Sequence, residues 1–117
     1  MMRPLSSVAV YLCVRPVDFR KQINGLAALV QTSLALDPFA EQIYVFTNRR
    51  RTAVKCLYWE RSGFVLWLKR LETERFHWPR GDSAVVTLTG QELNWLLDGF
   101  DLRQWRPHAA LRYTHVS

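Results

Sequence analysis

The sequence contains no hydrophobic run of the roughly 18 residues that a membrane-spanning helix requires. Its first 14 residues include a short apolar stretch, but no small-residue cleavage site follows that stretch. We therefore expect a cytoplasmic protein that has no membrane partner.

Cysteine is also scarce. Cys13 and Cys56 are the two cysteines of the chain, and each lies within an apolar, strand-like run. This context favours buried thiols over a disulfide or a redox pair, and the spacing offers no set of zinc ligands. We expect no metal and no other cofactor.

Catalytic motifs are absent as well. The chain has no GxxxxGK phosphate-binding loop, no HExxH pair and no nucleophile elbow, and its ten acidic residues are scattered. The sequence therefore predicts a protein that is not an enzyme. A small metal-dependent nuclease, which needs converging carboxylates, is the least favoured of the alternatives that stay open.

What the sequence does contain is a hydrophobic content of 49% and an aromatic content of 13%, above those of disordered chains. With 117 residues and no repeat or linker-like segment, the chain has the size of one domain that buries its own core. We expect a single domain over residues 1–117, compact from about 7 to 106, with an irregular tail at 107–117.

Apolar periodicity predicts an α+β fold with a small, mostly antiparallel sheet. A meander over residues 42–79, joined by an N-terminal strand, forms this sheet, and two helices at about 18–34 and 90–98 accompany it. The predicted strands are 7–14, 42–47, 52–60 and 64–72, with shorter ones at 75–79 and 84–88.

Both faces of the meander are predicted to be apolar. If the turn Glu60–Gly63 closes with an even number of loop residues, alternation gives two sets of side chains. One face carries Val54, Cys56, Tyr58, Val65, Trp67 and Lys69, and the other carries Lys55, Leu57, Trp59, Phe64, Leu66, Leu68 and Arg70. Such a sheet needs cover on both sides, so either both helices pack on it or one face contacts a partner.

The two helices differ in the clarity of their end signals. Thr89 and Glu92 form a capping box before the second helix, and Gly99 stands where a C-terminal cap belongs. The first helix is predicted from apolar residues at three- and four-residue steps, with Asp18 as its N-cap and Asp37-Pro38 after its end.

Positive charge lies near the start of the first helix. Arg20 and Lys21 fall in its predicted first turn, where the helix dipole favours negative charge. A phosphate docked near Arg15, Arg20 and Lys21 relieves this mismatch. The alternative is that Asp18 neutralises one cation and the other is solvated.

The strongest charge signal is a turn of three arginines. The net charge of the chain is +6, and between Arg49 and Arg75 eight Lys or Arg residues oppose three Glu residues. An arginine turn at one end of a meander can touch several phosphates. The predicted phosphate-binding set is Arg49, Arg50, Arg51, Lys55, Lys69 and Arg70, with Arg20 and Lys21 as a second group.

Two tryptophans of the meander offer a different interpretation. Trp59 and Trp67 are aromatic residues at strand spacing, which are more often core than contact residues. If they are exposed, they indicate an interface with another protein or with a second copy of the chain.

Three ordered segments resemble a known family. DFRKQINGLAALV, then LDPFAEQIYVFTNRRRTAVKCLYWERSGFVLWLKRLETERFHWP, then LTGQELNWLLDGFD are similar to the small accessory proteins of bacterial insertion sequences of the sixty-six family. The resemblance covers residues 8 to 106. It departs from the family at Gln22, where a hydrophobic residue is expected, and around the arginine turn, where a glycine is expected.

The resemblance implies a non-catalytic accessory factor for DNA transposition, encoded beside a separate DDE-type transposase. DNA and that transposase are the partners it implies. Our first hypothesis is a factor that binds DNA through the basic turn and sheet and assists the transposase. The alternative is an interaction module that docks on the transposase, or self-associates, without contacting DNA.

Overall fold

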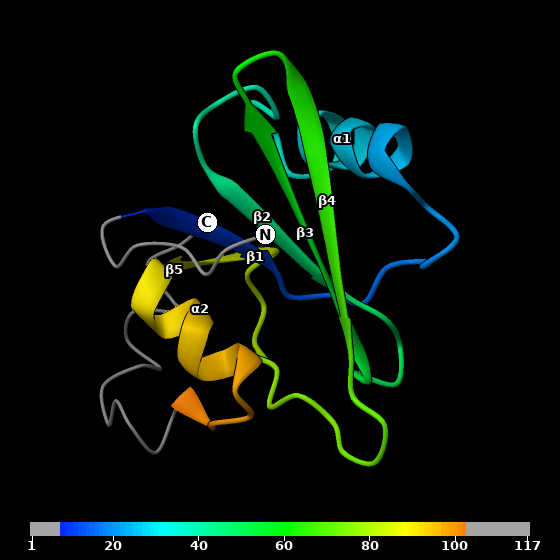
Figure 1. Cartoon of the computed structure of the whole chain (residues 1–117), viewed down its shortest axis with the longest axis vertical. Coiled ribbons are helices and arrows are strands. Elements are labelled where there is room, and N and C mark those ends of the chain that lie inside the picture. Colours follow the sequence, from blue (N-terminus) through cyan, green and yellow to red (C-terminus); the bar gives the residue numbers. More distant parts are fainter. Residues whose placement is uncertain (1–7, 103–117) are drawn as a thin grey trace.

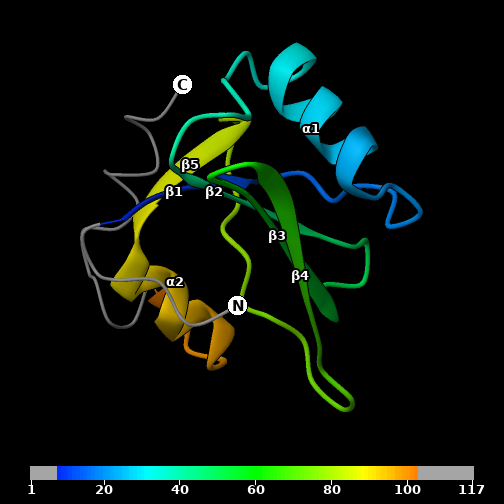
Figure 2. The same cartoon turned by 45° about the horizontal axis from the view of Figure 1, so that its top comes forward.

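The computed structural model describes residues 8–102 and contains a five-stranded sheet with one helix on each face (Figures 1 and 2). The strands are β1 (Ala9–Cys13), β2 (Ile43–Thr47), β3 (Ala53–Glu60), β4 (Gly63–Arg70) and β5 (Val85–Thr89), and the helices are α1 (Ile23–Thr32) and α2 (Gly90–Leu97). The strand order is β4-β3-β2-β1-β5. β1 and β2 pair in parallel and the other neighbours are antiparallel, which confirms the predicted fold class.

The two-residue turn between β3 and β4 sets the register that the alternation predicts. Glu60 pairs with Gly63, Cys56 with Trp67 and Val54 with Lys69, so these side chains share a face. The left-handed position of the turn is Arg61, with φ 54°, rather than Gly63. The predicted division of the meander into two faces is therefore confirmed.

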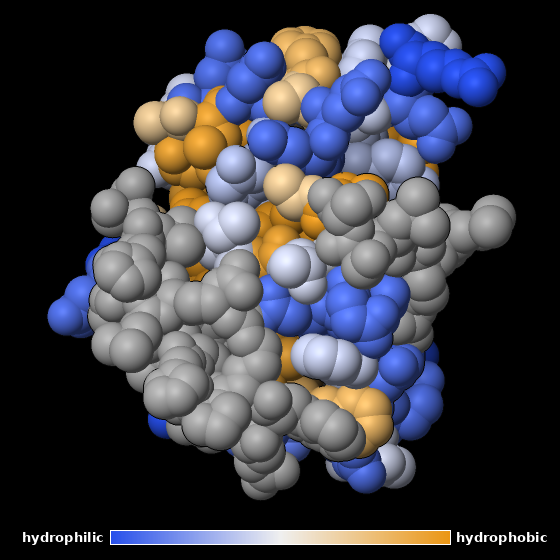
Figure 3. Space-filling model, turned by 90° about the vertical axis from the view of Figure 1, so that its left-hand side faces the viewer, coloured by the Kyte–Doolittle hydropathy of each residue, from blue (hydrophilic) through white to orange (hydrophobic). Residues whose placement is uncertain are grey.

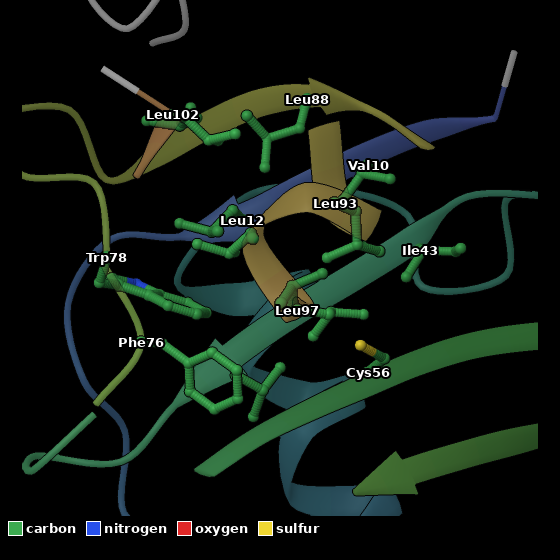
Figure 4. Close-up of a cluster of buried hydrophobic side chains, with 14 of the residues drawn as sticks. Val10, Leu12, Ile43, Cys56, Phe76, Trp78, Leu88, Leu93, Leu97 and Leu102 are labelled. Atoms are coloured by element: carbon green, nitrogen blue, oxygen red, sulfur yellow. The ribbon is translucent and has the colours of Figure 1, made fainter. Parts of the chain in front are cut away.

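One helix covers each apolar face. On the face of α2, the buried cluster combines Val10, Ile43 and Cys56 of the strands with Leu93 and Leu97 of the helix (Figure 4). On the face of α1, the cluster combines Tyr44, Phe46 and Leu57 of the strands with Leu26 and Val30 of the helix. The odd and even residues of β1 and β2 divide between these clusters, as period-two alternation requires.

The predicted capping box of α2 is present. The Thr89 hydroxyl accepts a hydrogen bond from the Glu92 backbone N–H at 3.1 Å, and the Glu92 carboxylate accepts one from the Thr89 backbone N–H at 2.8 Å. Gly99 has φ 95° just beyond the helix. Both end signals of this helix are therefore confirmed.

The first helix begins later than predicted. α1 starts at Ile23, and its N-cap is Gln22, whose side chain makes no capping hydrogen bond. Asp18 is not the N-cap, because its carboxylate binds the backbone and guanidinium of Arg20 instead. Arg20 and Lys21 consequently precede the helix and do not lie in its first turn.

The strand predicted at 75–79 is absent, and this segment is an irregular connection between β4 and β5. Phe76 and Trp78 are buried while His77 is exposed, so the alternation is real. The side chains anchor the segment to the core without a neighbouring strand. The segment 84–88 does form an edge strand, β5, and the tail predicted at 107–117 lies outside the described residues.

Some hydrophobic side chains reach the surface on the side of the molecule that carries β5 and α2. Figure 3 shows hydrophobic residues there in separate areas among hydrophilic ones. Within residues 8–102, the large hydrophobic side chains that remain exposed are Phe39, Leu68 and Phe100.

The end of α1 yields a prediction about stability. Ala35 has φ 55° after the helix, a left-handed conformation in which a Cβ is strained and glycine is not. Ala35→Gly should raise the free energy of unfolding by about 0.5–1 kcal/mol in urea titrations. The control is Ala28→Gly at an exposed position inside α1, which should lower it by about 1 kcal/mol. A loss of stability in both variants would contradict the assignment.

Candidate nucleic-acid interface

The strand directions bring three loops together at one end of the sheet. β1 and β2 run in parallel, and β3, β4 and β5 run so that the loops 14–22, 48–52 and 71–84 all leave from that end. Backbone hydrogen bonds join them, from Val17 N–H to Thr47 O at 2.9 Å and from Phe76 N–H to Arg51 O at 2.8 Å. We call these three loops, with Arg70 at the end of β4, the basic end.

The basic end concentrates positive charge. Its nine cations are Arg15, Arg20, Lys21, Arg49, Arg50, Arg51, Arg70, Arg75 and Arg80. They face four carboxylates, Asp18, Glu72, Glu74 and Asp82, so the excess is five positive charges. The loops at the opposite end, 33–42 and 60–63, hold three carboxylates and one arginine. Positive charge is therefore concentrated in the loops at one end of the strands, and the loops at the other end carry a small excess of negative charge.

The arginine turn is held in shape by Asn48. The Asn48 side-chain oxygen accepts hydrogen bonds from Thr52 N–H at 2.9 Å and Ala53 N–H at 3.2 Å, and its amide nitrogen donates to the Thr52 hydroxyl at 2.9 Å. Arg51 takes the left-handed position with φ 59°, where glycine is the residue without strain. The hydrogen bonds of Asn48 thus hold Arg51 in the turn geometry for which the family resemblance leads us to expect a glycine.

The three arginines of the turn differ in accessibility. Arg49 and Arg50 are exposed at the tip, whereas Arg51 is half-buried and its Nε is buried without a hydrogen-bond partner. Arg49 and Arg50 therefore offer the free guanidinium groups of this turn.

Lys55 has a different environment from the one predicted for a phosphate contact. It is buried, and its ammonium donates hydrogen bonds of 2.8 Å to Phe19 O and to Lys21 O. The ammonium also lies 4.6 Å from the centroid of the Phe19 ring. Burial lowers the pKa of Lys55, and the charge of Asp18 partly opposes that shift. Lys55 therefore fixes the backbone that carries Arg20 and Lys21.

Lys69 is likewise engaged within the fold. Its ammonium donates a hydrogen bond of 2.8 Å to the carbonyl of Leu97, the last residue of α2. A cation at a helix C-terminus is stabilised by the helix dipole. Lys69 therefore ties β4 to α2, which a sequence pattern that places it on a strand does not reveal.

Two cations of the basic end, among the residues that the structure describes, form ion pairs. Arg20 binds Asp18 at 2.7 Å and Arg70 binds Glu72 at 3.2 Å, both at exposed positions. The hydrogen bond from the Arg20 side chain, followed by that from its backbone, lowers the pKa of Asp18 to about 2. Exposed pairs of this kind contribute little to stability.

Two cations of the basic end were not predicted as candidate contacts from the sequence. Arg75 and Arg80 are exposed and flank the buried anchors Phe76 and Trp78. The pairing of β5 with β1 returns their loop to the arginine turn. The signal available in the sequence was the buried-exposed-buried pattern at Phe76–Trp78, which we assigned to a strand.

The two candidate interface tryptophans are half-buried. Trp67 packs against the core cluster under α2. Trp59 lies edge-on to Phe39 and Phe64, with ring centroids 5.1 and 5.0 Å apart, near the end opposite the arginine turn. Neither ring belongs to the basic end.

The described part of the chain offers neither a metal centre nor a membrane-spanning helix. Over the span 8–102, no three His, Cys, Asp or Glu side chains come together in a group that could hold a metal ion. Within the same span, no helix has the length and apolar character needed to cross a membrane.

Fold and charge together define a small, basic α+β protein with a helix on each face of its sheet. The family comparison is more specific, because the model for the IS66 Orf2-like proteins matches residues 8–107. The chain therefore belongs to the IS66 Orf2-like family, and this membership associates it with an accessory role in transposition.

Two curated relatives from Sinorhizobium fredii (strain NBRC 101917 / NGR234) are similar over most of their length. The uncharacterized protein y4jC is 32% identical over 117 residues, covering 100% of both chains. The uncharacterized protein y4hO is 31% identical over 105 residues, covering 86% of this chain and 91% of the relative. No solved structure matches the chain.

Proposed function

We propose that this chain is a non-catalytic accessory factor of transposition that holds DNA through the phosphate contacts of its basic end. The observation that carries the proposal is the excess of five positive charges on three loops that the strand topology brings together. Fixed cations at one end of a rigid sheet displace counterions from DNA when they bind phosphates. Membership in a transposition-associated family supports DNA as the polyanion that these cations bind.

The contacts differ in the roles we assign to them. Arg49 and Arg50 make the central contacts, because they are exposed at the tip of a turn that Asn48 fixes. The outer contacts come from the remaining cations, which are Arg15, Arg20, Lys21, Arg51, Arg70, Arg75 and Arg80. Lys55 and Lys69 support the contact surface from within the fold.

This mode of binding reads the DNA backbone and not its bases. Phosphate contacts position a protein on a duplex and carry no sequence information of their own. The helix α1 is packed on the sheet through Leu26 and Val30, and α2 through Leu93 and Leu97, so neither helix presents its apolar face to a groove. We expect similar affinity for the end of the mobile element and for a scrambled duplex.

The test is fluorescence anisotropy with both duplexes across a series of salt concentrations. Replacing Arg49 and Arg50 with glutamine should reduce the steepness of the log-log salt dependence by about 1.8, because each phosphate contact contributes about 0.9. Arg50→Glu should weaken binding to both duplexes by about tenfold or more.

The matched control is Arg61→Glu, which makes the same charge change at an exposed position in the other hairpin turn. It should leave the affinity nearly unchanged. Equal losses from Arg50→Glu and Arg61→Glu would mean that net charge alone attracts DNA, and an unchanged affinity in Arg50→Glu would remove the arginine turn from the interface.

The transposase encoded by the same element is the second partner that we propose, and the family membership supports it. The structure supports less strongly the alternative in which a whole sheet face docks on that transposase, because α1 packs on one face and α2 on the other. Immobilised transposase that retains the wild-type chain and its Arg49/Arg50 glutamine variant equally would support a docking surface outside the arginine turn.

A further inference from the structure

One long edge of the sheet has no neighbouring strand in the described part of the chain. β4 stands at the end of the strand order and pairs only with β3, over eight consecutive residue pairs (Figure 1). The strand at the other edge, β5, is five residues long. An unpaired edge presents a row of backbone N–H and C=O groups that can accept another strand.

The features that normally protect such an edge are missing from most of β4, where exposed charge is confined to Arg70 at its end. The strand contains no proline, and its register with β3 runs without a bulge from Gly63 to Arg70. Residues 64–68, FVLWL, carry no charge. The next residue, Lys69, directs its ammonium to the carbonyl of Leu97 and so does not shield the edge.

The side chains along this edge are incompletely covered. Phe64, Leu66 and Leu68 lie on the face of α1, and Leu68 is 57% exposed. Phe39, which is 54% exposed, packs beside Phe64 with ring centroids 5.2 Å apart. A strand added at β4 would therefore bury apolar surface in addition to pairing the backbone.

We infer that β4 pairs in antiparallel fashion with β4 of a second copy, which forms a continuous ten-stranded sheet. A two-fold axis perpendicular to the sheet keeps the α1 faces of both copies on the same side. With Leu66 at the axis, Leu66 faces its own counterpart and Phe64 faces Leu68 of the other copy. Apolar residues then meet apolar residues across the new pair.

The charge distribution favours a second copy in this orientation. Antiparallel pairing places the basic end of each copy beside the opposite end of the other, where Asp37, Glu41 and Glu60 outnumber Arg61. The two basic ends are held apart at opposite ends of the shared sheet, so their like charges do not oppose assembly. Each basic end remains free, and the inference does not depend on the proposed DNA binding.

The test is the mass of the full-length chain in solution without DNA, measured by sedimentation over a range of micromolar concentrations. The wild-type chain should approach twice the mass of one chain, and Leu68→Lys should remain at the mass of one chain with an unchanged circular dichroism spectrum. The control is Phe100→Lys, which replaces another exposed hydrophobic residue away from β4 and should dimerise as the wild type does.

A second measurement tests the register. Leu66→Cys should form a disulfide-linked dimer under mild oxidation, because the two Leu66 residues face each other at the axis, whereas Cys13 and Cys56 are buried in each chain. A wild-type chain that stays monomeric throughout, or a dimer that Leu68→Lys leaves intact, would overturn the inference. Failure of DNA binding in the anisotropy experiment would leave this result unaffected.

Discussion

Replacing Lys55 with methionine is expected to lower the free energy of unfolding by about 2–4 kcal/mol. Methionine keeps the length of the side chain but has no donor, so the carbonyls of Phe19 and Lys21 lose their 2.8 Å hydrogen bonds to the buried ammonium. The contact between that ammonium and the Phe19 ring is lost too. Urea denaturation followed by circular dichroism measures the effect.

Lys21→Met is the matched control for Lys55→Met. Both variants remove one ammonium group, but Lys21 is exposed and its side chain is not needed for the hydrogen bond that its carbonyl accepts. We expect Lys21→Met to change the free energy of unfolding by less than about 0.5 kcal/mol. Equal effects of the two substitutions would show that Lys55 does not hold the 19–21 segment.

The contribution of Lys55 should also depend on pH in a defined direction. Its pKa is lowered in the folded state, chiefly by burial, so the folded protein releases this proton at a lower pH than the unfolded chain does. The unfolded chain then binds more protons in the interval between the two pKa values, and stability rises with pH there. The difference in the free energy of unfolding between wild type and Lys55→Met should therefore grow as pH rises toward the pKa of an unperturbed lysine. A difference that shrinks over this range would contradict a pKa lowered by burial.

Lys55 also shows where prediction from the sequence ends. Period-two alternation correctly placed it on the face opposite Val54 and Cys56, because a two-residue turn fixes the register of the hairpin. Its hydrogen-bond partners are 34 and 36 residues away in the chain, in a segment that we predicted to be helical. A local pattern gives the face of a strand but not what packs against that face.

The basic end was predicted only in part for a similar reason. The arginine turn could be predicted because its residues are neighbours in the sequence, and Arg49 and Arg50 are exposed there as expected. The approach of the 14–22 loop depends on the parallel pairing of β1 with β2, and that of the 71–84 loop on the pairing of β5 with β1. These long-range pairings bring Arg20 and Arg80 toward the same end, and no periodicity in the sequence encodes them.

The start of α1 illustrates a competition between local hydrogen bonds. Apolar spacing extends back to Phe19, which made Asp18 a reasonable N-cap. In the structure, the Asp18 carboxylate accepts hydrogen bonds from the backbone and the side chain of Arg20, and this compact turn takes the place of a first helical turn. Asp side chains favour such turns because they bind nearby backbone groups.

Trp78→Ala should be more disruptive than Lys55→Met, with a loss of about 3–5 kcal/mol in the free energy of unfolding. Trp78 is buried in the α2-side cluster (Figure 4). Its indole N–H donates a hydrogen bond of 3.0 Å to the carbonyl of Cys13 at the end of β1. Alanine leaves a large cavity and an unpaired carbonyl. Thermal and urea denaturation measure the loss, and His77→Ala, an exposed neighbour, should change stability by less than about 0.5 kcal/mol.

Trp78→Phe should keep the chain folded, so it tests how Trp78 anchors the 71–84 loop without unfolding the protein. It removes the hydrogen bond to Cys13 and part of the buried volume, for an expected loss of about 1–2 kcal/mol. Because Trp78 pins the loop that carries Arg75 and Arg80, this variant should also loosen those two cations relative to the arginine turn. DNA affinity should then fall severalfold while the salt dependence stays near that of the wild type, since no charge has been removed. An affinity equal to that of the wild type would place Arg75 and Arg80 outside the interface and confine the phosphate contacts to the other two loops.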